Sequence, residues 1–286
     1  MMYKHWGNTY GDCRMTPGLE ERLKRVDTKK AKLDAVRPLP PNTIASLRDK
    51  MILEWTYHSN AIEGNTLTLR ETKVVLEGIT VGGKSLREHF EATNHRAAIF
   101  HVERIVAREE RSSEGQIRNL HGLILRGIDD DQAGRYRREN VAIAGASTTP
   151  PDFLHLDEEM RNLIAWLEAA GRMHPVERAA EFHARFEKIH PFADGNGRTG
   201  RLLLNLELMR AGFPPAVIRK EDRLTYYNAL DEACVTGVYD SVATLVADTV
   251  QRTLEGYLAV LHPPLEPEPT NKPLRGICGV APVPRF

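Results

Sequence analysis

Helix-start and helix-stop signals recur along most of this chain, and they restrict its fold more than any other feature of the sequence. Residues 85–88, Ser-Leu-Arg-Glu, have the pattern of a capping box, in which the serine and the glutamate satisfy backbone N–H groups reciprocally. Thr16 and Pro17 have the residue types preferred at an N-cap and in a first turn, and Thr68 can begin a short helix that Gly78 ends. These signals predict an all-α fold.

Apolar spacing places further helices between these signals. Ile44, Leu47, Met51, Trp55 and His58 recur at intervals of three and four, which predicts one buried stripe on a helix. The helix expected over residues 16–35 is mostly charged, so we predict that it is solvated. The remaining helices are expected over residues 68–78, 85–108, 113–127, 157–170, 175–189, 198–211, 221–233 and 239–260.

One segment, residues 134–151, differs from the helical pattern on both sides of it. Val141, Ala142, Ile143 and Ala144 are extended in character, and glycine and prolines interrupt the chain after them. We therefore predict a small β-hairpin flap in this segment.

Charge and cysteine content exclude several classes of protein. The chain has 39 Lys plus Arg and 39 Asp plus Glu, so its formal net charge is zero, and we expect neither nucleic acid nor a membrane as partner. Cys13, Cys234 and Cys278 are odd in number and far apart, which indicates a reducing compartment. The sequence has no signal-peptide core at its start and no run of about 18 apolar residues. We expect a soluble, cytoplasmic protein.

The segment 190–201, HPFADGNGRTGR, carries the predicted chemistry. Gly195, Asn196 and Gly197 form a tight turn just before a predicted helix, where backbone N–H groups can converge on an anion. Asp194 comes directly before that turn, where a carboxylate is well placed to hold Mg²⁺ beside a phosphate. Phe192 is expected to point inward and fix the loop to the core.

Two arginines and a histidine complete this predicted site. Arg198 and Arg201 are three residues apart on the next helix, so they share a face and can donate forked hydrogen bonds to phosphate oxygens. His190 can accept a proton near neutral pH. Taken singly, each of these residues is better explained by a helix–loop–helix turn with a solvated aspartate and surface arginines; the complete set at this spacing favours the phosphate site.

This run resembles the signature of the Fic family of AMP transferases, H-x-F-x-[DE]-G-N-G-R-x-x-R, and every specified position matches. The segments SNAIEGNTLTLRET, GKSLREHFEATNH, GRYRRENVAIAG and PPAVIRKEDRLTYYNAL also look like segments of that family. The resemblance implies that His190 is the general base and that Asp194 binds Mg²⁺. It also implies that ATP phosphates are held by the loop and the helix after it, through Gly195, Asn196, Gly197, Arg198 and Arg201.

Further roles follow from the same resemblance. Asn205 lies four residues beyond Arg201 and is expected to help hold the nucleoside. Tyr226 and Tyr227 occupy positions where the family holds adenine, although a core pair on an amphipathic helix explains them equally well. Residues 141–144 correspond to the edge that aligns the target protein by strand addition.

Residues 59–64, SNAIEG, match the family's inhibitory pattern [ST]-x-x-x-E-[GN]. Ser59, Glu63 and Gly64 are its specified positions. If Glu63 pairs with Arg201, that arginine is not free for the γ-phosphate, so the resemblance implies autoinhibition. The alternative is that Glu63 is an ordinary surface carboxylate.

The resemblance also implies a domain organisation. A Fic-fold helical core is expected over residues 113–212, after an N-terminal helical extension (1–41) and a helical region with the inhibitory motif (42–112). Helices over 213–262 are expected to pack on the core. Residues 263–286 hold seven prolines and are expected to form an extended tail.

Three functions remain open from the sequence. The first is an ATP- and Mg²⁺-dependent protein adenylyltransferase, which moves AMP to a Tyr, Thr or Ser hydroxyl of a protein substrate. The second is the reverse reaction, AMP removal, with Glu63 positioning a water. The third is an antitoxin-like or scaffold protein without activity, which the presence of His190 disfavours. Self-modification and a homodimer are left open.

Residues 78–85, GITVGGKS, satisfy the Walker A pattern of a P-loop. A P-loop needs a buried strand before it, whereas the preceding residues have a helical pattern that Gly78 ends. We therefore expect Lys84 to face solvent and Ser85 to cap a helix.

Overall fold

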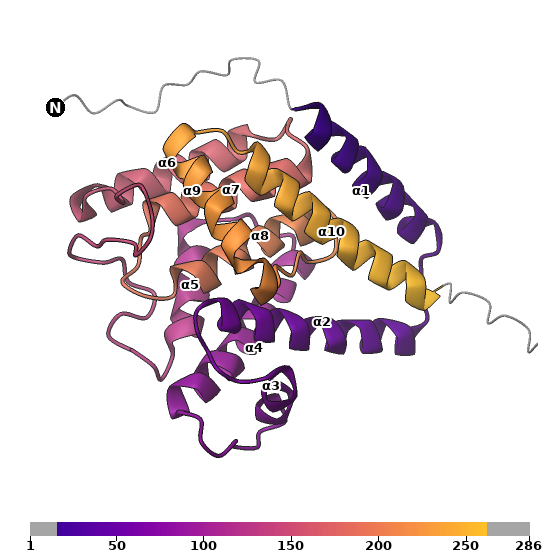
Figure 1. Cartoon of the computed structure of the whole chain (residues 1–286), viewed down its shortest axis with the longest axis horizontal. Helices are drawn as coiled ribbons and strands as arrows, with labels where there is room; N and C mark the ends of the chain where they lie inside the picture. The colour runs from indigo at the N-terminus through magenta and orange to yellow at the C-terminus, as the bar shows by residue number, and fades with distance from the viewer. Residues whose placement is uncertain (1–15, 262–286) are drawn as a thin grey trace, which may run out of the picture.

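The computed structural model describes residues 16–261, and these residues fold into α-helices and two short 3₁₀ segments (Figure 1). The α-helices in chain order are α1 (Pro17–Ala35), α2 (Pro41–Ile62), α3 (Leu69–Leu76), α4 (Leu86–Ala107), α5 (Glu114–Leu125), α6 (Leu156–Ala169), α7 (Pro175–Ile189), α8 (Asn196–Arg210), α9 (Arg223–Thr236) and α10 (Asp240–Leu261). The 3₁₀ segments are η1 (Phe153–His155) and η2 (Lys220–Asp222). None of the residues 16–261 lies in a strand, so the all-α prediction is confirmed for this range.

Helix α8 lies at the centre of the molecule, between two hydrophobic clusters. Its five leucines are fully buried, and the charged side chains of Arg198 and Arg201 are buried with them. Leu204 and Leu208 belong to a hydrophobic cluster that includes residues of α1, α7, α9 and α10. Leu202, Leu203 and Leu206 belong to a second cluster with residues of α2, α4, α5 and α6. The loop that enters α8 is therefore held by both halves of the core.

The prediction that residues 16–35 form a solvated helix is wrong for one face of α1. Leu19, Leu23, Val26 and Leu33 are buried, and α1 packs along α10 (Figure 1). Their spacing of four, three and seven places them on one side of the helix. The charged majority of the helix concealed this stripe.

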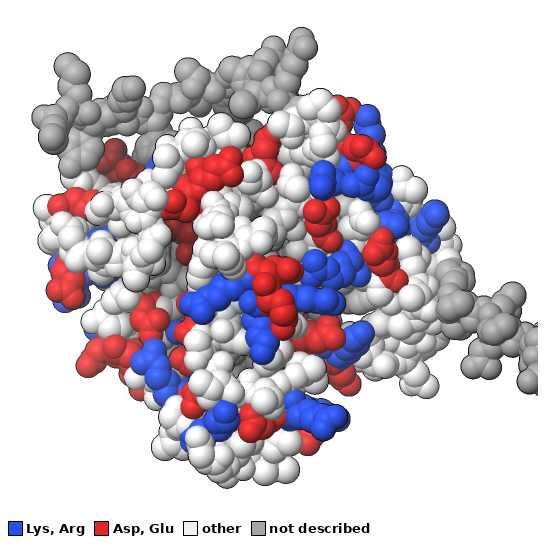
Figure 2. Space-filling model, viewed as in Figure 1, with Lys and Arg blue, Asp and Glu red and all other residues white. Residues whose placement is uncertain are grey.

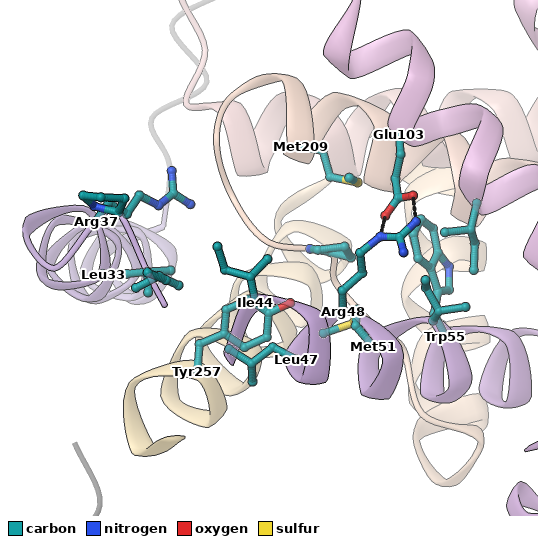
Figure 3. Close-up of a pocket in the computed structure, with 15 residues that line it drawn as sticks. Leu33, Arg37, Ile44, Leu47, Arg48, Met51, Trp55, Glu103, Met209 and Tyr257 are labelled. Atoms are coloured by element: carbon teal, nitrogen blue, oxygen red, sulfur yellow. Dashed lines mark hydrogen bonds and ion pairs between the residues drawn. The ribbon is translucent and has the colours of Figure 1, made fainter. Parts of the chain in front are cut away.

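The apolar stripe predicted on α2 lines a cavity as well as the core. Leu47 and Trp55 are buried, whereas Ile44 is 46% exposed. With side chains from α1, α4 and α10 they surround a cavity of about 590 Å³, where Arg48 and Glu103 form a two-pronged ion pair on the wall (Figure 3). The cavity adjoins the N-terminal half of α2, and no residue of the segment 190–201 lines it.

The predicted β-hairpin flap over residues 134–151 is wrong, since this segment consists of turns and irregular chain. Its ends are held by a side chain: Arg137 is buried and donates hydrogen bonds to backbone carbonyls on both sides of the expected hairpin tip. The tip is anchored to α9, because the backbone N–H and Oγ of Ser147 both donate to Asp231. These side-chain bonds take the place of a strand ladder, and residues 141–143 have no neighbouring strand to pair with in the described chain.

The surface carries charges of both signs. On the face shown in Figure 2 the basic and acidic side chains are interspersed. No helix within residues 16–261 is long and apolar enough to cross a membrane. Cys234 is a free thiol, whereas Cys13, Cys278 and the tail predicted over residues 263–286 lie outside the described residues.

Candidate active site

The loop between α7 and α8 begins with an unusual backbone conformation. His190 ends α7 in the left-handed region, with φ of 49°, which is uncommon for a residue other than glycine. Its N–H donates to the carbonyl of Phe186 at 3.0 Å, and its own carbonyl accepts a bond from Arg137 Nε at 3.0 Å. Strained backbone of this kind persists only where the surroundings impose it. Here the Arg137 side chain bonds both the His190 carbonyl and the Glu139 carbonyl, so it holds the histidine next to the segment that follows Arg137.

The turn into α8 is closed by an asparagine. Both polar atoms of the Asn196 side chain bond the backbone of Phe192, at 3.0 and 2.8 Å. The Phe192 ring is fully buried and stacks on His121 at 3.6 Å between ring centroids, which confirms that it points inward. Gly195 has φ of 78°, a conformation that glycine adopts without cost. The first N–H groups of α8 are thereby held open at the helix N-terminus, where an anion is favoured.

Burial changes the pKa of the histidine in this loop. It lowers the pKa of His190 below the ordinary value of 6.5, and a hydrogen bond with the Glu187 carbonyl offsets this only in part. His190 is therefore neutral at pH 7, the form that accepts a proton.

Asp194 presents an ionised carboxylate at the mouth of the site. Its side chain is 49% exposed. Burial alone would raise the pKa of this carboxyl, but Arg198, the Gly195 N–H and Arg87 outweigh it and lower the pKa. The Asp194 carbonyl bonds His121 Nε2 at 2.8 Å, which fixes the backbone at this point.

A single carboxylate of this kind suits Mg²⁺ that arrives with a nucleotide. No group of three or more His, Cys, Asp or Glu side chains that could hold a metal is present among residues 16–261. Mg²⁺ commonly takes one or two protein carboxylates, several waters and substrate phosphates instead of a protein cage. The exposed, ionised Asp194 next to an anion-binding helix end fits that description.

The two arginines of α8 that belong to the predicted site are not surface residues. Arg198 is 2% exposed and Arg201 is 3% exposed. Buried cations need partners, and each arginine has a carboxylate from another helix. Arg198 Nη1 lies 3.2 Å from Glu91 of α4, and Arg201 Nη2 lies 2.8 Å from Oε1 of Glu63, at the end of α2.

The inhibitory segment contacts Arg201 at two of its three specified positions. Besides Glu63, the Ser59 hydroxyl accepts a bond from Arg201 Nε at 3.1 Å, and the Ser59 carbonyl accepts one from Nη2 at 2.8 Å. Gly64 has φ of 96°, which lets the chain turn away directly after Glu63. A Cβ at Gly197 would overlap the Glu63 carboxylate. The Glu63 side chain thus lies directly against the predicted phosphate loop, and whether it inhibits stays a prediction.

The structure separates the residues predicted to hold the nucleoside. Asn205 is fully buried, and its amide bonds both backbone polar atoms of Ala216, at 2.7 and 3.1 Å, so its role here is structural. Tyr226 is also buried and pairs its hydroxyl with His183 Nε2 at 2.8 Å, which agrees with the core alternative. Tyr227 is 37% exposed, and its hydroxyl lies 3.4 Å from the Ile62 carbonyl, beside Glu63. Of these three side chains, only that of Tyr227 is exposed to solvent.

Four charged residues at this site were not predicted from the sequence: Arg87, Glu91, Arg137 and Glu187. Arg87 and Glu91 lie one turn apart on α4 and contact Asp194 and Arg198. Pairs of opposite charge at this spacing usually decorate solvated helix faces, so the pattern alone does not reveal them. The available signal was that both fall inside the family-like segment GKSLREHFEATNH.

Glu187, on the last turn of α7, is a nearly buried carboxyl beside Arg201. Its side chain is 11% exposed, and a Cβ at Gly200 would overlap its Oε1 atom, so the glycine leaves the room that the carboxyl fills. Burial raises the pKa of Glu187 to about 8; Arg201 opposes this rise and Glu63 adds to it. Glu187 therefore carries a proton at pH 7.

We expect Glu187→Gln to stabilise the protein at pH 8 and to change its stability little at pH 5. Between its ordinary pKa of 4.5 and its folded pKa of about 8, the folded state keeps a proton that the unfolded state has released. The free energy of unfolding of the wild type therefore falls as pH rises through this interval, whereas that of Glu187→Gln does not fall for this reason. A difference of about 1–4 kcal/mol at pH 8 corresponds to a Tm higher by about 3–10 °C.

Thermal unfolding of both proteins from pH 5 to pH 8.5 measures this difference. Glu168→Gln, which changes an exposed glutamate of α6, is the matched control and should show no widening gap. A Tm difference that stays constant with pH would mean that Glu187 is ionised in the folded protein.

The Walker-like octapeptide, residues 78–85, is a connection between two helices. Helix α3 precedes it instead of a strand, and Ser85 caps α4 in a complete capping box. Lys84 does not face solvent as predicted: its Nζ donates to the carbonyl of Thr66 at 2.7 Å. The P-loop alternative is therefore excluded, and the lysine instead ties two loops together.

We expect Lys84→Ala to leave the affinity for ATP within about threefold of wild type, because this lysine bonds protein backbone in a connection that forms no P-loop. A P-loop lysine contacts nucleotide phosphates directly. Calorimetric titration with ATP compares the two proteins. A loss of affinity by a factor of ten or more would place the phosphates at Lys84 and not at the α8 N-terminus.

The fold and the site together define a helical protein with an anion-binding loop at the start of a buried helix. The family model described as Fic/DOC family matches residues 111–208. The Fic-1 protein of C. elegans has a similar structure, with a TM-score of 0.78 and 31% identity over 85% of this chain and 72% of that one. A Fic domain containing signaling protein from Bacteroides thetaiotaomicron gives a TM-score of 0.75 and 30% identity over 83% of this chain and 96% of that one. The chain belongs to the Fic/DOC family.

Relatives with known names extend this finding. Protein adenylyltransferase Fic of Nematostella vectensis is 37% identical over 246 residues, which cover 84% of this chain and 56% of the relative. The protein of the same name from Drosophila willistoni is 36% identical over 242 residues, which cover 84% of this chain and 48% of the relative. The chain thus spans about half the length of these relatives.

Proposed function

We propose that this chain is a protein adenylyltransferase, which transfers AMP from ATP to a Tyr, Thr or Ser hydroxyl of a protein and is held inactive by Glu63. The observation that carries the proposal is the convergence of a neutral histidine, an ionised aspartate and two buried arginines on the N-terminus of α8. The name of the relatives from Nematostella and Drosophila supports the same reaction.

His190 is the general base of the proposed reaction. Its neutral ring accepts the proton of the target hydroxyl as the hydroxyl oxygen forms a bond to the α-phosphorus of ATP. The bond between the α-phosphorus and the bridging oxygen to the β-phosphate breaks, and pyrophosphate leaves. Because Arg137 and Phe186 hold the backbone of His190, the ring starts close to its working position.

The remaining residues hold the phosphates. Asp194 is the carboxylate that would take Mg²⁺, which supplies positive charge to the phosphate oxygens when it is bound. The N–H groups at the start of α8 face the phosphates, and Arg198 and Arg201 neutralise the outer ones. Positioning and charge stabilisation are the main terms in such a transfer.

The proposed autoinhibition by Glu63 follows from the geometry of its ion pair with Arg201. Arg201 donates from Nε and Nη2 to Ser59 and from Nη2 to Glu63 in this structure, so an incoming γ-phosphate has to displace a carboxylate. The carboxylate also lies against Gly197 of the phosphate loop. In this arrangement ATP is held away from the pose in which its α-phosphorus faces the target hydroxyl.

The target is proposed to align along residues 141–144. No backbone N–H of these four residues donates to a backbone acceptor within the described chain. Although the hairpin is absent, such open backbone is able to pair with an extended segment of another protein. Arg137 holds this segment next to His190.

Labelled ATP in a cell lysate tests the proposed reaction. Label on the α-phosphate should appear on protein, while label on the γ-phosphate should not, and mass spectrometry of the labelled species identifies the target. The Glu63→Gly protein is the form to use, with Glu63→Gly/His190→Ala as its control. Transfer of γ-label instead of α-label would show a kinase, and no label on any protein, including the chain itself, would refute the proposal.

A second function, removal of AMP, is favoured by the position of Glu63. Its carboxylate lies against the phosphate loop, where it is able to orient a water toward an AMP–protein bond. The self-modified Glu63→Gly protein, if formed, is a substrate for the test, and loss of AMP on addition of wild type would show this activity.

A further inference from the structure

A ring of alternating charges surrounds the predicted metal ligand. Arg87 Nη2 lies 2.5 Å from Asp194 Oδ2, and its Nε lies 3.2 Å from Glu91 Oε1. Glu91 Oε1 is in turn 3.2 Å from Arg198 Nη1, and Arg198 Nη2 is 3.3 Å from Asp194 Oδ1. We call these four residues the metal-side ring; two come from α4 and two from the catalytic segment.

The ring is separate from the Glu63–Arg201 pair. The two buried arginines of α8 have separate carboxylate partners, Glu91 for Arg198 and Glu63 for Arg201. Asn65, two residues after Glu63, donates to the second oxygen of Glu91 at 2.8 Å. Asn60 of the inhibitory segment also donates to the Glu91 carbonyl, at 3.3 Å. The inhibitory segment and the ring are therefore in contact, but Glu63 pairs with Arg201 whereas the ring engages Arg198 and Asp194.

Resting on the proposed function, we propose that Arg87 is a second lock of the site: it occupies the carboxylate of Asp194 and so opposes the binding of magnesium nucleotide until it is displaced. A cation and a guanidinium compete for the same carboxylate oxygens, because Asp194 Oδ2 is already bonded to Arg87 and Oδ1 is shared by Arg198 and the Gly195 N–H. Arg87 is the member that can be displaced into solvent, since its side chain is 56% exposed while that of Arg198 is 2% exposed. Displacement of Arg87 leaves Arg198 in place to meet the phosphates.

The role assigned to Glu91 is that of a positioning residue. Its buried carboxylate holds Arg87 and Arg198 at a fixed separation. It is itself fixed by Asn65 and by the helix that carries it. When Arg87 is displaced, Glu91 still orients the Arg198 guanidinium. This role explains why the Glu91 carboxylate lies beside a predicted phosphate-binding site.

The test is calorimetric titration of ATP into the wild type and the Arg87→Ala protein, each with Mg²⁺ and with EDTA. An exposed ion pair contributes modestly, so the affinity for magnesium ATP should tighten about twofold to fivefold in Arg87→Ala. The gain should vanish in EDTA, because no metal then competes for Asp194. It should persist in Glu63→Gly/Arg87→Ala relative to Glu63→Gly, because Glu63 pairs with Arg201 whereas Arg87 pairs with Asp194. Arg104→Ala, which removes an exposed arginine from the same helix, is the matched control.

Each outcome decides one question. If wild type and Glu63→Gly both fail to bind magnesium ATP, the proposed function falls. If they bind and Arg87→Ala binds no more tightly in Mg²⁺ than they do, the lock is wrong while the function stands. A weaker affinity in Arg87→Ala that is equal in Mg²⁺ and EDTA would make Arg87 a phosphate ligand and would also overturn the lock.

Discussion

Replacing His190 with alanine is expected to lower the rate of AMP transfer by about 10²–10⁴-fold, the usual cost of losing a general base. ATP should still bind nearly as tightly, because the phosphate contacts belong to the α8 N-terminus and its arginines. The loop should survive the change, since His190 is held through its backbone N–H and carbonyl. Transfer from α-labelled ATP and calorimetric affinity, measured on the same preparations, give the two quantities.

The pH dependence of wild type offers a second check on this base. Burial lowers the pKa of His190 below its ordinary value of 6.5. As pH is lowered from 8, kcat/KM should therefore stay high to a pH below 6.5 and decline only when His190 becomes protonated. His101→Ala, a change in a histidine of α4 outside the loop, serves as control. Transfer by His190→Ala within a few-fold of wild type would remove this residue from the mechanism.

Glu63→Gly is expected to raise AMP transfer, including self-modification, by about 10- to 100-fold. A hydrogen bond to a charged group contributes about 1.5–3 kcal/mol, and each 1.4 kcal/mol is a factor of ten. Without the carboxylate, Arg201 is free to seat the γ-phosphate. Initial rates with α-labelled ATP, at saturating nucleotide, measure the gain.

The gain should depend on Arg201. Adding Arg201→Ala to Glu63→Gly should remove most of it, because residues that form one switch have non-additive effects. The same Glu63→Gly change should abolish any removal of AMP, since that reaction needs the carboxylate to orient water. If Glu63→Gly is no more active than wild type on any hydroxyl acceptor, the brake hypothesis is wrong.

Local signals were sufficient to predict most of the helices. Ser85 and Thr68 cap α4 and α3 as their sequences indicate, because a capping box depends on residues only three apart. Phe192 points inward, as expected from its place between a base and a turn. Local pattern failed where partners are distant: Arg137 replaces a strand ladder by bonding carbonyls at both ends of a segment, and no periodicity reports that.

In the candidate site, too, contacts between residues distant in sequence were not predictable from local patterns. The contact of Glu63 with Arg201 joins residues 138 positions apart, and only the resemblance to a family suggested it. The resemblance assigned Asn205 to the nucleoside, and its spacing from Arg201 gives the side of the helix but not whether that side faces a ligand or the core. Glu187 went unnoticed because its carboxyl is made unusual by burial, which a sequence does not display.

The space above Gly200 links two positions that are thirteen residues apart in the chain. The carboxyl of Glu187 fills the volume that a side chain at position 200 would need. Evolution therefore cannot vary these positions independently. A relative that carries a larger residue at the position of Gly200 should carry a smaller side chain, or one turned elsewhere, at the position of Glu187, and a relative that keeps the acid should keep the glycine. The covariation of these two positions would record, across the family, whether a protonated carboxyl lies behind the second arginine of the motif.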